Sequence, residues 1–182
     1  NFLLYDFFTT DGYVNEDVFA YSNRAGNERG MVLYHNKFAA TRGWVRMSVG
    51  YKDKANGQIV QRSLRDGLSI TNDGNRYLIF RDLATGLEYL RNSGELCERG
   101  MYVELDAYKY HVFVDFREVV DNEWQHYAHL AEYLNGRGVP SIDEALRELF
   151  LQPVHRAFTA LVNADTFRGI RVGEVTPEAV ET

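Results

Sequence analysis

The stretch VFAYSNR-AGNERG-MVLYHNK, residues 18–37, decides the fold of this chain. Its two flanks are short and rich in aromatic and β-branched residues, and they enclose a charged turn that contains glycine. This pattern predicts two antiparallel strands joined in a hairpin. The apolar run NFLLYDFF lies upstream, at residues 1–8, and we expect it to be the connection from a preceding domain.

Further strands are predicted along the first two thirds of the chain, where glycines separate short segments of the same composition. The turn DLATG separates Tyr77–Arg81 from Leu87–Arg91 and predicts a second hairpin. The segment 101–116, MYVELDAYKYHVFVDF, is too long for one ordinary strand, so we expect a bend at Asp106 and Ala107. The remaining predicted strands are Met31–Phe38, Trp44–Lys52 and Ile59–Leu64. Seven or eight short strands predict a mainly β fold, an antiparallel β-sandwich.

The organisation changes near residue 120, where the hydrophobic period shifts from two to about 3.6. We therefore expect residues 1–120 to form the sandwich and residues 121–167 to form a C-terminal extension of two to three helices. That extension is too short to bury a core alone, so it should pack on the sandwich or on an absent neighbour. Residues 168–182 lack a periodic pattern and are expected to be a frayed tail.

Capping signals mark the expected helices. Asp121 or Asn122 can cap the first helix, and the sequence NGRG ends it. Ser141 and Glu144 form a capping box at the start of the second helix. Pro153 is expected to break or kink that helix before it continues.

Composition restricts the partners of the chain. The net charge of −6 disfavours nucleic acid and anionic membranes as partners, because binding to either needs a dense basic face. The single cysteine, Cys97, excludes an internal disulfide and two-cysteine metal motifs, and we interpret it as a small core residue. No run of about 18 apolar residues is present, so no membrane span is expected. We recognise no signal peptide, but this absence does not decide the location of the protein, for which the cytoplasm is favoured.

The motifs of catalysis are missing from the sequence. It has neither a Gly-x-Ser-x-Gly nucleophile turn nor a phosphate-binding loop. Glu123 and His126 have the Glu-x-x-His spacing of di-iron sites, but the partner motif would have to lie on a facing helix, so we interpret them as part of a solvated helix face. Glu104 and Asp106 can share one face of a strand at about 6.6 Å, a spacing that alone does not indicate catalysis. No catalytic residue, metal site or cofactor is therefore predicted.

Aromatic side chains suggest a different kind of site, because a sugar ring stacks on an exposed aromatic ring. Trp44, close to Arg42 and Arg46, is the best candidate, and Tyr51 and Tyr21 follow it. The alternative interpretation places Trp44 in the core, since it begins an apolar strand.

The hairpin resembles the start of the C-terminal β-sandwich of alpha-amylase superfamily glycoside hydrolases. In that family a strand, a charged turn with Gly-Glu-Arg and a second strand follow one another, and here AGNERG, residues 25–30, matches the turn. The block YLIFRDLATGLEYLRNSGEL, residues 77–96, is similar to sequences of large bacterial alpha-amylase-like proteins. Tyr108 and Tyr110 stand where an inward-packing aromatic residue closes the family's sandwich.

The resemblance implies a role without chemistry of its own. The two Asp and one Glu of the family's catalytic machinery lie on a (β/α)8 barrel, which typically needs about 250 residues, and their motifs do not occur here. The leading hypothesis is a non-catalytic accessory domain of an alpha-amylase-like glycoside hydrolase acting on α-glucans. Its partners would be the absent catalytic barrel of the same polypeptide, which it stabilises, and the polysaccharide. Two alternatives stay open: a free-standing carbohydrate-binding module, and a protein-interaction domain that uses helices 122–162.

Overall fold

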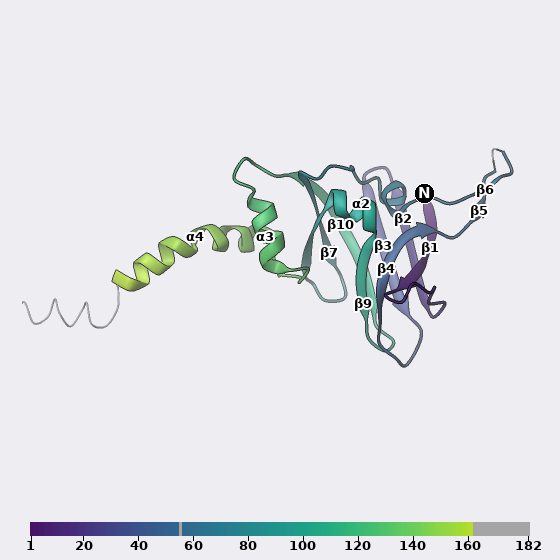
Figure 1. Cartoon of the computed structure of the whole chain (residues 1–182), viewed down its shortest axis with the longest axis horizontal. Coiled ribbons are helices and arrows are strands. Elements are labelled where there is room, and N and C mark those ends of the chain that lie inside the picture. The colour runs from purple at the N-terminus through teal and green to yellow at the C-terminus, as the bar shows by residue number, and fades with distance from the viewer. Residues whose placement is uncertain (55, 162–182) are drawn as a thin grey trace, which may run out of the picture. The chain divides into compact units, whose positions relative to one another are not determined.

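The structure, a computed structural model, describes residues 1–54 and 56–161 (Figure 1). It divides into two compact units, Asn1–Ile142 and Asp143–Thr182. The strands, all in the first unit, are β1 (Phe2–Thr9), β2 (Val18–Ala25), β3 (Glu28–His35), β4 (Thr41–Ser48), β5 (Tyr51–Lys52), β6 (Ile59–Val60), β7 (Arg76–Asp82), β8 (Glu88–Asn92), β9 (Met101–Leu105) and β10 (Tyr110–Val120). The helices are α1 (Leu64–Leu68), α2 (Ser93–Arg99), α3 (His126–Leu134) and α4 (Ile142–Leu161).

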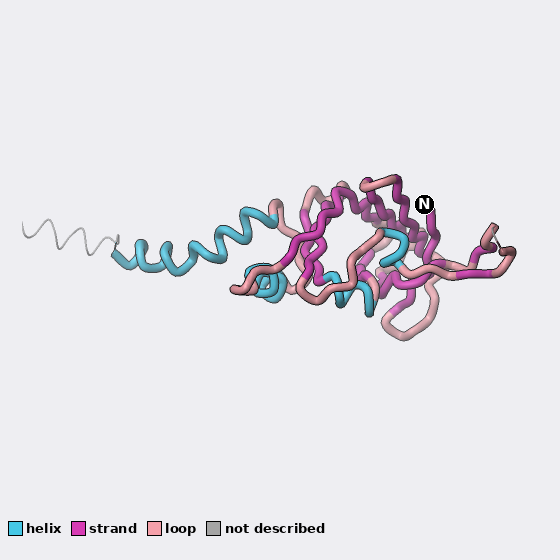
Figure 2. Tube along the Cα trace, turned by 90° about the horizontal axis from the view of Figure 1, so that it is seen from above, coloured by secondary structure: helices cyan, strands magenta, loops and turns pink. Residues whose placement is uncertain are grey.

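Eight strands form one antiparallel sheet in the order β8-β7-β10-β3-β2-β1-β4-β9, and β5 and β6 form a separate two-stranded ribbon. The sheet curls, so that strands near its two edges face the same core (Figures 1 and 2). Phe80 of β7 and Met101 of β9 belong to one cluster of buried apolar residues, although five strands lie between them in the sheet. Phe7 and Met31, from two of the strands in between, are fully buried in the same cluster. The prediction of a mainly β, sandwich-like fold followed by C-terminal helices is confirmed.

The predicted hairpin is β2–β3, whose strands pair along all eight residues of each. Gly26 takes φ +60° at the first position of the two-residue loop, as a type II′ turn requires. Arg29, just after the loop, donates to the carbonyl oxygens of Leu68 at 3.3 Å and Phe116 at 3.1 Å, and pairs with Glu118 at 3.2 Å. The charged turn therefore has a structural role: it fastens the hairpin to α1 and β10.

The segment NFLLYDFF is strand β1, between β2 and β4, and not a connection between domains. Leu3, Tyr5 and Phe7 are buried, whereas Phe2 and Leu4 face outward and are exposed. The expectation of a connection is wrong because both faces of this strand carry apolar residues. The alternation of apolar and polar residues that usually indicates a strand is therefore absent from the sequence.

The middle of the chain departs from two predicted strands. The segment Trp44–Lys52 divides into β4 and β5, and Ile59–Leu64 contains only the short β6 before α1 begins. Ser63 and Asp66 form a capping box at the start of α1, so the local signal there is for a helix. Helix α2, which the sequence analysis did not predict, follows β8 directly and is capped by the side chain of Asn92.

The predicted bend between β9 and β10 is present, with Tyr108 at φ +54°. Tyr108 and Tyr110 are 54% and 52% exposed, so neither is the inward-packing aromatic residue that the resemblance implies. Phe113 and Phe116 of β10 occupy the core instead. The expectation is wrong because the alternation along β10 directs Tyr110 outward.

Helix α3 begins later than predicted, at His126, and its N-cap position is Gln125, not Asp121 or Asn122. Asp121 nevertheless contacts the first turn from outside the helix. The Asp121 carboxylate accepts hydrogen bonds from the backbone N–H groups of Tyr127 and Ala128, each at 2.9 Å. These bonds satisfy N–H groups that the first turn of a helix leaves without partners. Trp124 precedes the helix and is 65% exposed.

The chain between α3 and α4 covers part of the edge strand β8. Glu88 and Val139 exchange backbone hydrogen bonds of 2.7 and 2.9 Å. The buried Glu88 carboxylate also accepts from the N–H of Ile142 at 2.9 Å and from Arg81 at 2.9 Å. A backbone segment on a sheet edge blocks pairing with another chain at that point.

Helix α4 is continuous from Ile142 to Leu161, so the predicted break at Pro153 is not observed. The expected frayed tail, 168–182, and the part of the helical extension after residue 161 lie outside the described residues.

Candidate functional site

Trp44 lies on the outer face of the sheet. Gly43 and Val45, its neighbours in β4, are buried and face the core, so Trp44 faces outward together with the exposed Arg42 and Arg46. The alternative interpretation of Trp44 as a core residue is therefore wrong. The apolar composition of this segment predicts that it is a strand, but it does not show on which face of the strand Trp44 lies.

Trp44 is the middle ring of three that lie side by side on β1, β4 and β9. Phe8 is opposite Trp44 in the β1–β4 register, and Tyr102 is opposite Trp44 in the β4–β9 register. The ring centroids of Trp44 and Tyr102 are 5.2 Å apart, with an interplanar angle of 58°. Because neighbouring strands are about 4.8 Å apart, the three rings span roughly 10 Å across the strands. We call Phe8, Trp44 and Tyr102 the aromatic row.

A hollow of about 460 Å³ lies beside this row, where the loop after β1 and the end of α2 meet β4. We call it the Trp44 hollow. It combines aromatic rings, threonine residues and guanidinium groups; the residues that line it include Phe8, Thr9, Thr10, Trp44, Arg46 and Arg99. Rings for stacking beside polar groups for hydroxyls are what a sugar site needs.

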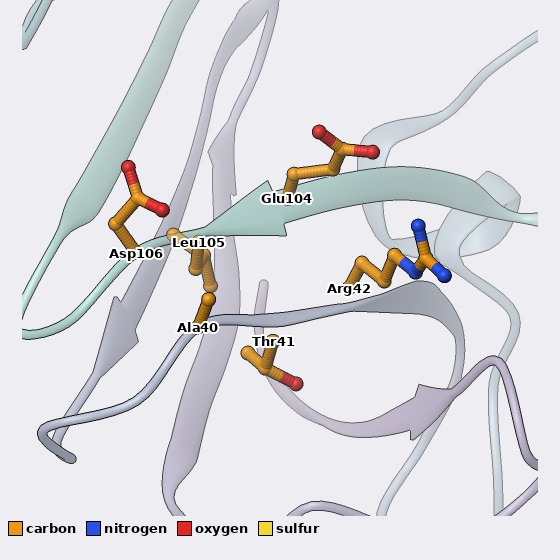
Figure 3. Close-up of a pocket in the computed structure, with 6 residues that line it drawn as sticks. All are labelled: Ala40, Thr41, Arg42, Glu104, Leu105 and Asp106. Carbon is orange, nitrogen blue, oxygen red and sulfur yellow. The ribbon is translucent and has the colours of Figure 1, made fainter.

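Charged side chains flank the aromatic row on its other side. Figure 3 shows Arg42, Glu104 and Asp106 projecting on one side of β4 and β9, while Thr41 points to the opposite side. They border a second hollow of about 290 Å³. The hydroxyl of Tyr102 donates to Glu104 at 2.8 Å, and this hydrogen bond raises the pKa of Tyr102. Glu104 thereby connects the aromatic row to the charged flank.

The other predicted sugar-binding residues are not brought to Trp44. Tyr51, in the β5–β6 ribbon, is partly buried and packs against the core cluster. Tyr21 faces outward on β2, where its ring lies 5.5 Å from that of Phe2. The three predicted residues therefore do not form one site.

Tyr21 belongs to a broad apolar surface on the outer side of β1, β2, β3 and β10. Two rows of paired residues run along this side: Leu4, Tyr21, Val32 and Val112 form the first, and Phe19, Tyr34 and Tyr110 form the second. Asp6 is the next outward position of β1 after Leu4. Several members are largely exposed, including Phe2 at 58%, Phe19 at 52% and Leu4 at 45%. We call this surface the apolar face; its residues are Phe2, Leu4, Phe19, Tyr21, Val32, Tyr34, Tyr110 and Val112.

His111 is paired with a buried carboxylate whose role is structural. His111 Nδ1 lies 2.9 Å from the buried Asp82 carboxylate. Asp82 also accepts from the N–H groups of Val112 and Ala84 and from the hydroxyl of Thr85. Burial raises the pKa of Asp82, but these hydrogen bonds outweigh it and hold the pKa below its ordinary value. The carboxylate therefore holds together the DLATG turn and β10.

Other candidate centres carry no site chemistry. Among residues 1–54 and 56–161, no group of three or more His, Cys, Asp or Glu residues is arranged to hold a metal ion. Cys97 packs against the core cluster, and burial raises the pKa of its thiol, which disfavours the nucleophilic thiolate.

Sequence reasoning missed Phe8, Tyr102 and Arg99 as neighbours of Trp44. Phe8 was hidden in the run assigned to a connection, and Tyr102 and Arg99 are more than 50 residues from Trp44 in the chain. The register of β4 with β1 and β9 brings Phe8 and Tyr102 to Trp44, and Arg99 reaches it from the end of α2. The available signal was alternation: Tyr102 and Glu104 occupy every second position of MYVEL.

No protein-family model matches the chain, and neither does any curated protein or solved structure. No helix in the described part of the chain is long and apolar enough to cross a membrane.

Proposed function

We propose that this chain is a non-catalytic accessory sandwich of an alpha-amylase-like glycoside hydrolase that acts on α-glucans, and that it stabilises the catalytic barrel by packing against it. The apolar face is the observation that carries this proposal. An exposed, contiguous apolar surface of this kind marks a place where another protein surface packs. The resemblance of the β2–β3 hairpin to the family's sandwich supplies the identity of that partner.

The location of the apolar face supports the proposal. It includes Phe19 and Tyr21 of the hairpin that carries the resemblance, together with Leu4 of the neighbouring β1. The solvated face of an ordinary antiparallel sheet carries mostly polar side chains, whereas this face carries mostly apolar ones. Packing against a barrel would remove these side chains from water.

Two assays test the proposal. The chain incubated with soluble starch is expected to release no reducing sugar, and release by pure protein would contradict it. In the whole polypeptide encoded by the same gene, Leu4→Glu with Phe19→Glu should lower the melting temperature. At a concentration where the isolated chain is monomeric, the same pair should leave its melting unchanged.

Leu83→Glu is the matched control for those variants. Leu83 is 59% exposed but lies in the β7–β8 turn, outside the apolar face. An equal loss of stability from this control would show that the apolar face has no special role in packing.

The aromatic row favours a second candidate function, the binding of α-glucan as a carbohydrate-binding module. A linear row of rings suits successive sugars of a chain, since each ring can stack on one sugar face. Trp44→Ala should abolish binding to maltoheptaose in calorimetry. Trp124→Ala should have no effect, because Trp124 is exposed outside the row. The absence of any heat with glucans would contradict this function.

A further inference from the structure

The Trp44 hollow is positively charged in a chain whose net charge is −6. Arg46 of β4 and Arg99 from the last turn of α2 both line it. The described residues that line the hollow include no Asp or Glu. Trp44 and the hydroxyl-bearing Thr10 complete this local chemistry.

Neither guanidinium group makes a hydrogen bond or an ion pair with any residue in the described part of the chain. Their backbones also approach closely, since a Cβ added to Gly100, next to Arg99, would lie 2.9 Å from the Cβ of Arg46. Two like charges held in one hollow repel each other, and an anion bound there lowers that repulsion. Arginine also presents two parallel N–H donors to a carboxylate or phosphate.

We propose that the Trp44 hollow binds a sugar that carries an anionic group, either a phosphate ester or a carboxylate. The pyranose ring stacks on Trp44, Arg46 and Arg99 bind the anion, and Thr10 hydrogen-bonds a sugar hydroxyl. This inference deepens the second candidate function, on which it rests, by naming the class of sugar.

The dimensions and charge of the site favour a sugar anion over nucleic acid. The volume of about 460 Å³ lies within the ordinary range for small-ligand sites, about 300–1,000 Å³. Nucleic acid needs an extended basic surface that contacts many phosphates. Here the arginines are confined to one hollow of an acidic chain.

Tryptophan fluorescence gives a direct measurement of binding. The chain has two tryptophans, so a Trp124→Phe background leaves Trp44 as the single reporter. Glucose 6-phosphate, glucuronate and maltoheptaose are titrated separately, with calorimetry as a second readout. We expect saturable changes with one or both anionic sugars, which distinguishes phosphate from carboxylate, and weaker binding at 0.5 M NaCl because salt screens charge.

Arginine variants decide between the anionic sugar and a neutral one. Arg46→Gln and Arg99→Gln should each weaken binding of the anionic sugar about tenfold or more, because each removes a charge-assisted hydrogen bond. Arg62→Gln, which removes the same charge from an exposed position outside the hollow, should have no effect. Arg46→Lys should bind more tightly than Arg46→Gln.

The outcomes separate the two proposals. Equal binding of maltoheptaose and the anionic sugars, unchanged in both Gln variants, would overturn this inference and leave glucan binding supported. The absence of a response to all three sugars would overturn both.

Discussion

At the scale of single residues, the hydroxyl of Tyr5 is tightly constrained by its neighbours. It lies 2.6 Å from the buried hydroxyl of Ser22, and a Cβ added to Gly67 of α1 would lie 2.0 Å from it. Burial raises the pKa of Tyr5 to about 12, although the hydrogen bond with Ser22 acts in the opposite direction. The folded state therefore holds a proton that the unfolded state loses near pH 10.

This shift predicts a loss of stability in alkali. Between pH 10 and pH 12 the unfolded chain binds fewer protons than the folded one, so the free energy of unfolding falls as pH rises. Tyr5→Phe should remove about 2–3 kcal/mol of that fall. Urea unfolding of both proteins at pH 8, 10 and 11.5 measures the difference, with Tyr5→Phe/Ser22→Ala as the control for the lost hydrogen bond. If the free energy of unfolding of the wild type and of Tyr5→Phe fell in parallel with pH, the raised pKa of Tyr5 would be contradicted.

Asp82 predicts the opposite dependence, in acid. Its pKa is lowered in the folded state, so its contribution is present above its unfolded pKa of about 4 and is lost as pH falls through the folded pKa. Asp82→Asn should cost about 2–4 kcal/mol at pH 7, because the amide NH2 group replaces one of the two carboxylate oxygens, each of which accepts from two of the four donors.

The pH dependence of that cost is the decisive measurement. The difference in unfolding free energy between the wild type and Asp82→Asn should shrink below about pH 4. Asp115→Asn, at a position whose side chain is 71% exposed, should change stability by less than about 0.5 kcal/mol. If Asp82→Asn lowers the free energy of unfolding by the same amount at pH 3 and pH 7, the negative charge of Asp82 does not contribute to stability.

At the scale of elements, the pairing of β1 with β4 depends on Gly43. A Cβ at this position would lie 2.0 Å from the carbonyl oxygen of Phe8, which is backbone and cannot move aside without disturbing the ladder. Gly43→Ala should destabilise the fold by at least about 2 kcal/mol in urea unfolding and reduce sugar binding at the aromatic row. Gly74→Ala is the matched control, because nothing lies within 4 Å of its Cβ position. Equal stability of the two variants would contradict this interpretation.

The sequence predicted those elements whose signals are local. The β2–β3 and β7–β8 hairpins follow from turn chemistry, and the bend before β10 follows from strand length. Strand β1 was missed because both of its faces carry apolar residues, one for the core and one for the apolar face.

The candidate site was only partly predictable for a related reason. Trp44 could be named from its residue type and its arginine neighbours. Its partners Phe8 and Tyr102 depend on pairing between distant strands, which residue composition does not specify. Tyr51 and Tyr21 were chosen by type alone, and the fold directs them to different places.

At the scale of the whole molecule, the apolar face predicts self-association of the chain when its partner is missing. Light scattering at rising concentration should report oligomers of the wild type, and Leu4→Glu with Phe19→Glu should restore a monomer. The control is Phe158→Glu, at an exposed position of α4. If only the Phe158 variant becomes monomeric, the surface that associates is α4, and the alternative function of helix-mediated protein interaction is favoured.

The bonds from Val139 and Ile142 to Glu88 have a practical consequence for anyone who divides the polypeptide into pieces. A fragment that stops at residue 120 would strip the lateral cover from an outer strand and leave the Glu88 carboxylate with fewer donors. Such a fragment should precipitate more readily than one that stops at residue 142. The natural place for a cut, a fusion or a graft is therefore after α3 and its following loop, some twenty residues beyond the point where the last strand ends.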